Sequence, residues 1–392
     1  MIGDTGSTEE KSASKRTVRN ENYFPQVISA ETALSFHSSD PSLHSTLSVI
    51  KNGPQGTAVS SGPYTPLTSP QSTWMKQRSA NHSNVQNVFE TSSTQYTNAM
   101  KALEQWRFIC IDFRSYASKH SRILKYRVRH GIPNNLRGFV WQQFASSRDR
   151  LTYYPENYYQ QLCSRQDAPF EGDILRDIAR TFPKHMLFRD KSSVGQDSLF
   201  RVLRAYSLHD TDVGYCQGMG FLSGLLLLYM NEEDTFLMLI SILDCYEMAG
   251  LFKPGLPLLG RFLYQFERMF KSHMPRLYDH LKRENVETSM YASQWFMTLF
   301  SYSFPLDIVV RIFDVFFNEG IKMIFRVALA VLKLLQETLF NQSFEAALHT
   351  VKTGPNNMNG ETLIQTAFNI KIRHSTLQEI EREYEWKKMK PV

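Results

Sequence analysis

The chain has 392 residues, of which 42% are hydrophobic, 21% charged and 13% aromatic. These fractions allow a large buried core and exclude a wholly disordered, collagen-like or coiled-coil chain. Lys and Arg total 44 and Asp and Glu total 38, and a net charge of +6 over so long a chain does not by itself indicate a nucleic-acid partner.

The cysteines and the longest apolar segment indicate a soluble protein of a reducing compartment. Cys110, Cys163, Cys216 and Cys245 lie far apart and form no CxxC pair, which excludes a disulfide framework. The amino-terminal segment lacks the apolar core of a secretory signal. Residues 219–230 are the longest apolar stretch, and spanning a bilayer needs roughly 20 residues. We therefore expect a cytoplasmic protein in which this stretch is a buried helix.

Residues 1–98 differ in composition from the rest of the chain. About 30 of the first hundred residues are Ser or Thr, and only about 16 are Leu, Ile, Val or Phe, too few to offset chain entropy. The composition predicts a mostly disordered, low-complexity region. Two Ser/Thr-Pro dipeptides at 65–66 and 69–70 leave two interpretations open, a polar linker or a tail adjusted by phosphorylation.

From about residue 99 onward, apolar residues recur at helical spacing. The stripes include Trp106, Ile109 and Phe113, then Leu199, Val202, Leu203 and Tyr206, then Trp295, Phe296, Leu299 and Phe300, then Val327, Val331, Leu332 and Leu335, and finally Leu377, Ile380 and Tyr384. Prolines at 133, 183, 257, 275, 305 and 355 stand where helices are expected to begin or end. No segment has the period of a strand, and no repeat of a solenoid is visible. We predict one all-α domain over residues 99–392, with about a dozen helices or more.

Several common catalytic patterns are absent from the sequence. It contains no GxxxxGK[ST], HExxH or GxSxG, and its eleven histidines are scattered. Gly218-Met219-Gly220 lacks the third glycine of a dinucleotide fingerprint. We therefore expect no nucleotide, cofactor or metal site of the chain's own.

Residues 131–141 combine turn, cap and anchor residues. Gly131 and Pro133 favour a turn, Asn135 is a candidate helix cap, and Trp141 gives the following helix an apolar anchor. A structural role explains this segment fully.

Residues 174–183 place an arginine at the end of a helix. Ile174 and Ile178 share one face, and Asp177 and Arg180 are spaced to pair on another. Pro183 disfavours helix at the residue before it, so Arg180 is expected in or just after the last turn. Either the two charges form a plain surface pair, or Asp177 positions Arg180 to point outward. An exposed pair contributes only about 0.2 to 0.5 kcal/mol, so Asp177→Ala is expected to leave stability close to wild type.

Residues 214–221 place a glutamine between two glycines. Gly214 and Gly218 let another backbone or a ligand come close, and Gln217 leads into the apolar helix. In the structural interpretation, Gly214 is the N-cap of that helix and Gln217 is its third residue.

Together these segments resemble the TBC domain, the GTPase-activating module for Rab-type small GTPases. Its IxxDxxRT and YCQG motifs are matched by Ile174, Asp177, Arg180 and Thr181, and by Tyr215, Cys216, Gln217 and Gly218. Its GIPxxLRGxxW segment matches residues 131–141, and residues 293–300 and 311–320 also look like TBC segments. The resemblance covers about residues 125–350. It is strongest to the subgroup of ecotropic viral integration site 5 and Rab GTPase-activating protein 1.

The resemblance implies a GTPase-activating protein that acts in trans on a GTP-loaded Rab and regulates vesicle traffic at endomembranes. Arg180 would be the arginine finger and Gln217 the glutamine finger, whereas GTP and Mg²⁺ would be bound by the partner. Supporting roles would fall to Asp177, Thr181, Tyr215 and Gly218, with Ile174 and Trp141 in the scaffold. The alternatives are a catalytically silent Rab-binding scaffold and a plain helical adaptor.

Overall fold

The computed structural model describes residues 100–389, and within that range the secondary structure is helical without a strand. Residues 100–111 form the first helical segment. The following α-helices are α4 (Phe113–Lys119), α5 (Ser121–His130), α6 (Arg137–Ala145), α7 (Tyr158–Ser164), α8 (Glu171–Ile178), α9 (Val194–His209), α10 (Met219–Leu227), α11 (Glu232–Asp244), α12 (Pro257–His273), α13 (Pro275–Arg283), α14 (Ser289–Met297), α15 (Leu306–Glu319), α16 (Lys322–Leu339), α17 (Phe344–Thr353), α18 (Gly360–Asn369) and α19 (His374–Met389). Short 3₁₀ helices are η1 (Asn134–Leu136), η2 (Ser147–Tyr153), η3 (Ala249–Leu251) and η4 (Gly354–Asn357). The predicted all-α class is confirmed, whereas the predicted tail, residues 1–98, lies outside the described residues.

The helices begin where the sequence supplies a proline or a side-chain cap. Pro257 and Pro275 are the first residues of α12 and α13, where the missing N–H of proline has no intrahelical partner to lose. Ser193 caps α9 by accepting the Gln196 N–H at 3.3 Å. Asn231 caps α11 in the same way, and the acidic first turn of α11 suits the positive end of the helix dipole.

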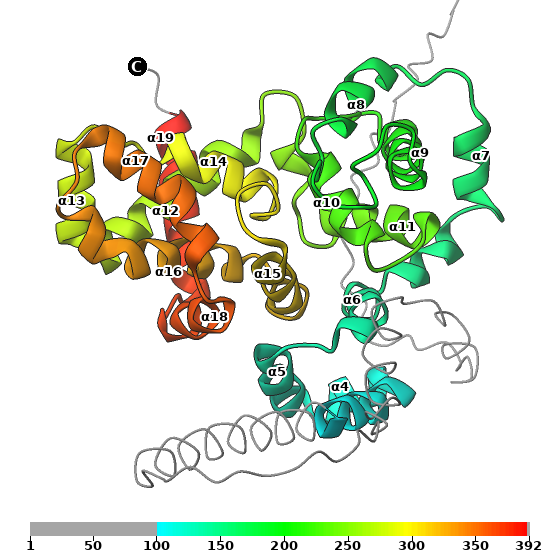
Figure 1. Cartoon of the computed structure of the whole chain (residues 1–392), viewed down its shortest axis with the longest axis horizontal. Coiled ribbons are helices and arrows are strands. Elements are labelled where there is room, and N and C mark those ends of the chain that lie inside the picture. Colours follow the sequence, from blue (N-terminus) through cyan, green and yellow to red (C-terminus); the bar gives the residue numbers. More distant parts are fainter. Residues whose placement is uncertain (1–99, 390–392) are drawn as a thin grey trace, which may run out of the picture. The chain divides into compact units, whose positions relative to one another are not determined.

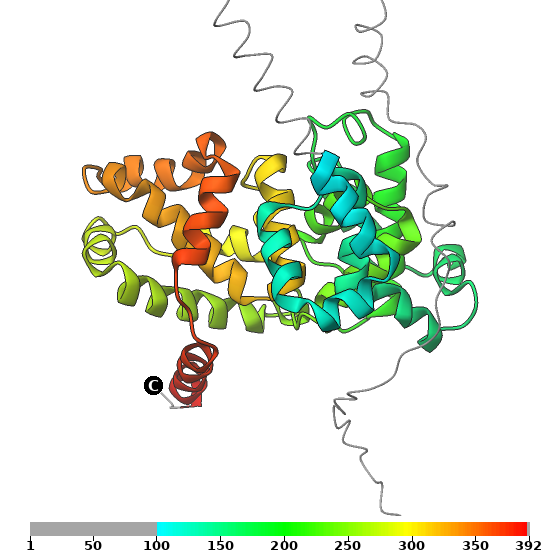
Figure 2. The same ribbon diagram turned by 90° about the horizontal axis from the view of Figure 1, so that it is seen from below.

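Helix α10 lies at the centre of one group of helices. It packs against α9 and α11, and α9 also contacts α7 and α8. These helices, green in Figures 1 and 2, lie together in both views. Met219, Leu222, Leu225 and Leu226 of α10 are fully buried, and burying a side chain of this size contributes about 1.5 to 3 kcal/mol. The prediction of a buried helix in this stretch is thus confirmed, and no described helix is long and apolar enough to cross a membrane.

The later helices form a second group, drawn in yellow-green to red in Figures 1 and 2. Helix α12 contacts α13, α14 and α19, and α16 contacts α14, α15, α17 and α18. The predicted stripe of α16 is buried through Val327, Val331 and Leu332. Helix α19 confirms the predicted C-terminal helix, with Leu377 and Ile380 buried.

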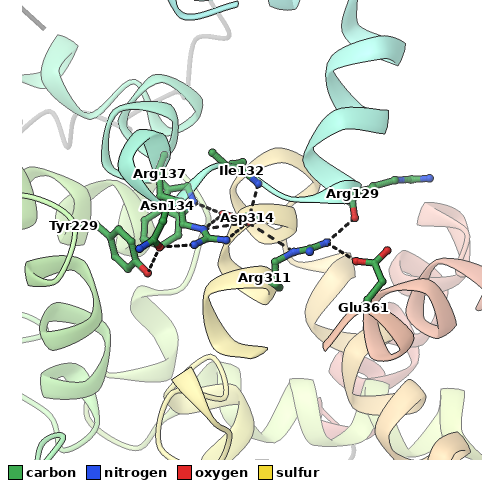
Figure 3. Close-up of polar contacts among 9 residues, drawn as sticks. Arg129, Ile132, Asn134, Arg137, Tyr229, Arg311, Asp314 and Glu361 are labelled. Carbon is green, nitrogen blue, oxygen red and sulfur yellow. Dashed lines mark hydrogen bonds and ion pairs between the residues drawn. The ribbon is translucent and has the colours of Figure 1, made fainter. Parts of the chain in front are cut away.

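A buried carboxylate joins the turn at residues 131–141 to α15. Asp314 accepts the Ile132 backbone N–H at 3.3 Å and the Arg137 guanidinium at 3.1 Å (Figure 3). It also accepts the Trp141 indole N–H at 2.9 Å. Burial raises the pKa of Asp314, and these bonds act in the opposite direction. The anchoring role predicted for Trp141 is confirmed.

The predicted cap at Asn135 is wrong. Leu136 occupies the N-cap position of α6, and no side chain caps that helix. Asn134 instead accepts from Arg137 at 2.6 Å and from the Tyr229 hydroxyl at 3.0 Å (Figure 3). The 3₁₀ turn η1 puts Asn135 one residue before the N-cap position and places Asn134 within reach of the Arg137 guanidinium.

Candidate functional site

Arg180 lies just beyond the end of α8, as predicted. The helix ends at Ile178, with Ala179 in the C-cap position, and Phe182 before Pro183 takes a positive φ of 45°. The Arg180 side chain is 48% exposed, so its guanidinium is within reach of solvent and of a partner. Ile174 and Ile178 are buried and hold α8 against the core, so the end of the helix is a fixed platform for Arg180.

Asp177 is the central residue of this site. Its carboxylate forms an ion pair with Arg180, accepts the Tyr215 hydroxyl and accepts the Gly218 backbone N–H at 3.3 Å. The residue is only 1% exposed. The expectation of an exposed Asp–Arg pair is therefore wrong, because Asp177 faces inward and only Arg180 faces outward.

The burial of Asp177 follows from its place in the helical pattern. Ile174 and Asp177 are three residues apart and therefore lie on the same face of α8, next to Ile178. This spacing fits an inward-facing carboxylate at Asp177, but it does not single that residue out. Asp173, one turn from Asp177, pairs with Arg176 at the same spacing but stays half-exposed, at 53%. Only the tertiary structure distinguishes these two pairs.

Thr181 holds the turn that contains Arg180 against helix α10. It is fully buried, and its hydroxyl donates to the Asp177 carbonyl at 2.9 Å. A Cβ at Gly220 would lie 2.9 Å from the Thr181 hydroxyl oxygen, and a Cβ at Gly224 would lie 3.0 Å from the Thr181 methyl carbon. The two glycines of α10 therefore allow the turn to pack directly on the helix.

Gln217 is exposed immediately before α10. The helix begins at Met219, and its N-cap is Gly218 with φ of 110°, a backbone conformation that favours glycine. The interpretation of Gln217 as the third residue of a helix capped by Gly214 is therefore wrong. The Gln217 side chain makes no hydrogen bond within the described residues. Its amide remains available to a partner.

Gly214 permits the tight turn on the other side of Gln217. It has φ of 59°, and a Cβ there would lie 2.5 Å from the Phe170 ring. Both flanking glycines thus serve the backbone of this turn. The predicted role of allowing close approach of a partner stays a prediction.

Tyr215 and Cys216 remain protonated at neutral pH. Burial, and then the bond to Asp177, raise the pKa of the Tyr215 phenol, so it serves as a hydrogen-bond donor. Burial, and then the Asp177 charge, raise the pKa of the Cys216 thiol. Since a thiolate is the reactive form, this environment disfavours a nucleophilic cysteine.

One aromatic residue beside the site was not singled out from the sequence. Tyr302 is 52% exposed, and its ring lies nearly perpendicular to that of Phe221 of α10, at 5.1 Å between centroids. Its backbone N–H donates to Thr298, whose methyl carbon would lie 3.6 Å from a Cβ at Gly218. This places a supported aromatic surface close to the Gln217 turn.

The chemistry available at this site is that of an arginine and an amide. Arg180 supplies a permanently charged donor fork, and Gln217 supplies both a donor and an acceptor. Among residues 100–389, no group of His, Cys, Asp and Glu side chains is arranged to hold a metal ion. The two exposed groups are thus suited to act on a ligand carried by another molecule.

Residues 134–340 match the family model of the Rab-GTPase-TBC domain. The chain belongs to this family. It is 39% identical over 301 residues to the ecotropic viral integration site 5 protein homolog of Homo sapiens, a match that covers 75% of the chain and 37% of that relative. It is 37% identical over 290 residues to the Rab GTPase-activating protein tbc-11 of Caenorhabditis elegans, covering 72% and 31%. The chain thus spans about a third of the length of these relatives.

Solved structures agree with this assignment. The RabGAP TBC domain of Chlamydomonas flagella aligns with a TM-score of 0.59 and 28% identity, over 70% of this chain and 96% of that one. The Ypt/Rab-GAP domain of Gyp1p aligns with a TM-score of 0.57 over 73% and 99%, and at 21% identity it supports the fold alone. The TBC resemblance recognised in the sequence motifs is therefore confirmed.

Proposed function

We propose that the chain is a GTPase-activating protein that supplies Arg180 and Gln217 in trans to a GTP-loaded Rab-type GTPase. The observation that carries the proposal is the shared carboxylate of Asp177. It bonds the Arg180 guanidinium on the turn that follows α8. It also bonds Tyr215 and Gly218 on the turn that precedes α10, and these two residues flank Gln217. One buried group therefore connects the two turns that carry the exposed side chains of Arg180 and Gln217.

Arg180 is the proposed stabiliser of the transferring phosphoryl group. An arginine supplied in trans raises the rate of GTP hydrolysis by roughly 10³ to 10⁵, which corresponds to about 4 to 7 kcal/mol. Its planar fork can bond two phosphate oxygens at once and keeps its charge throughout. In the unbound protein the guanidinium bonds the buried Asp177 carboxylate through Nε and Nη2, while the Arg180 side chain stays 48% exposed.

Gln217 is the proposed positioner of the attacking water. Its amide can accept a hydrogen bond from that water while donating to the partner's backbone. The turn that holds it is rigid because Gly218 is fixed by Asp177 and by the start of α10. Rigid placement matters because a misplacement of about 1 Å can cost roughly a hundredfold in rate.

The remaining site residues support these two groups. Asp177, Thr181, Tyr215 and Gly218 orient the two turns, and GTP with Mg²⁺ belongs to the partner. The chain would have no nucleotide site of its own, so it is an activator of another enzyme. We place it in the cytoplasm, recruited to endomembranes through the Rab, with a role in vesicle traffic and without a nucleic-acid partner.

The test is single-turnover GTP hydrolysis by a panel of purified Rab proteins, with and without the full chain. Acceleration of at least one Rab by orders of magnitude is the expected result. A chain that binds a GTP-loaded Rab but accelerates none of the panel would be a scaffold, and the proposal would be wrong.

A further inference from the structure

Asp210 organises the segment that leads from α9 to the turn before α10. It follows the last residue of α9, and its carboxylate accepts the backbone N–H groups of Asp212 at 3.1 Å and of Val213 at 3.2 Å. Its backbone carbonyl accepts the Gly214 N–H at 2.7 Å. Three consecutive N–H groups are therefore bonded to one residue. We call residues 210–214 the Asp210 turn.

These bonds are not needed to end α9. The Asp210 N–H already donates to the Tyr206 carbonyl at 3.0 Å, which closes the last turn of the helix. The groups that lack an intrahelical partner at the C-terminal end of a helix are carbonyls, which need donors and not acceptors. The acceptor atoms of Asp210 therefore serve the residues that follow the helix and not the helix itself.

Two buried side chains fix the Asp210 turn to the core. Tyr206 is 1% exposed, and its hydroxyl donates to the second carboxylate oxygen of Asp210 at 3.3 Å. Burial, and then the Asp210 charge, raise the pKa of the Tyr206 phenol, so it remains a donor. Val213 is 4% exposed and anchors the other end of the turn. The carboxylate thus connects a buried residue of α9 to the backbone of the turn.

The Asp210 turn complements the contacts of Asp177. The Asp177 carboxylate bonds the side chain of Tyr215 and the N–H of Gly218, which lie on the α10 side. These bonds do not determine the path of the backbone before Tyr215. Gly214 determines that path, because it has φ of 59° and donates its N–H to Asp210. The turn that carries the glutamine is therefore held at both ends by carboxylate residues.

We propose that Asp210 is a positioning residue for Gln217 in GTPase activation. The inference rests on the function proposed above, and it extends that function to a residue that acts through the backbone and not on the nucleotide. Gln217 must hold its amide in one place to orient a water, and a misplacement of about 1 Å can cost roughly a hundredfold in rate. The three bonds of the Asp210 turn fix the backbone that leads to Gln217, so its amide starts from a defined position.

The first experiment measures single-turnover GTP hydrolysis by a responsive Rab, with the full chain in excess. Asp210→Ala should lower the rate at saturation by roughly tenfold to a hundredfold. The chain concentration that gives half of the saturating rate should stay close to wild type, because a positioning residue affects kcat and not binding. Asp212→Ala is the matched control. Asp212 is exposed in the same turn, and the variant keeps its backbone N–H, so it should match wild type in both values.

Two conservative variants separate the acceptor oxygen from the charge. Asp210→Asn keeps an oxygen at the same distance from the backbone and loses the charge, so it should recover most of the wild-type rate. Asp210→Glu keeps the charge but moves the carboxylate by one methylene, so it should recover little. If the negative charge alone mattered, Asp210→Glu would be the more active of the two, and that order would overturn the proposal.

The second experiment measures the turn itself by hydrogen exchange of the amides of residues 212–214. Exchange should be roughly fivefold faster in Asp210→Ala than in Asp212→Ala, while the amides of α10 keep their protection, which shows that the domain is intact. Unchanged exchange, or faster exchange with a wild-type rate of hydrolysis, would overturn the inference. A wild-type chain that activates no Rab would refute the proposed function, and this inference with it, even if the turn exchanges as expected.

Discussion

Replacing Asp177 tests whether a buried carboxylate holds the two exposed groups together. In Asp177→Ala, the Tyr215 hydroxyl and the Gly218 N–H both lose their acceptor. A buried donor left without a partner costs about 1 to 3 kcal/mol. The two together predict a loss of about 2 to 6 kcal/mol in the free energy of unfolding. The loss of the Arg180 ion pair adds little, because that side chain is half-exposed.

The matched control is Asp173→Ala on the same helix. Asp173 and Arg176 repeat the spacing of Asp177 and Arg180, but both side chains are more than half exposed. The expected loss is at most about 0.5 kcal/mol. Urea unfolding followed by circular dichroism measures both variants, and single-turnover hydrolysis measures their effect on a responsive Rab. If Asp177→Ala unfolds at the same urea concentration as Asp173→Ala, Asp177 does not hold the two turns, and the argument for the site fails.

Three further predictions follow from the same geometry. Arg180→Lys should activate a Rab almost as poorly as Arg180→Ala, because a compact ammonium cannot form the two-point contact; near-wild-type single-turnover rates would show that charge alone suffices. Tyr302→Ala should raise the KM for the Rab several-fold with little change in kcat, as expected for a binding contact, while Tyr153→Ala, at an 80% exposed position on η2, should change neither value. Deleting residues 1–98 should leave cooperative unfolding and activation nearly unchanged; loss of the cooperative transition would place part of the folded unit in that segment.

Helix positions were predictable from the sequence because they depend on local periodicity. The apolar residues that recur at helical spacing in α9, α10 and α16 are buried, and their burial determines which face of each helix packs on the core. Proline marks the start of α12 and α13, because its fixed φ suits the first helical residue. The position of Arg180 beyond the end of α8 followed in the same way, from a proline three residues later.

The bonds inside the site were not predictable from local pattern. Asp177 and Gly218 are 41 residues apart, and their contact depends on how α8 and α10 pack. The wrong cap at Asn135 and the wrong helix start before Gln217 have a common cause. In both segments a turn before the helix moves its N-cap later in the chain. The 3₁₀ turn η1 moves it by one residue, from Asn135 to Leu136, and the turn that ends at Gly218 moves it by four, from Gly214 to Gly218.

The most direct test of the account is the single-turnover rate of GTP hydrolysis by a responsive Rab with four proteins: wild type, Arg180→Ala, Gln217→Ala and the double variant. Each single variant should lower the stimulated rate by orders of magnitude, and the double variant should be little worse than the poorer single one, because groups that act on one transition state are not additive. All four should melt at similar temperatures and bind the GTP-loaded Rab. A single variant that keeps the wild-type rate would contradict the claim that Arg180 and Gln217 act together.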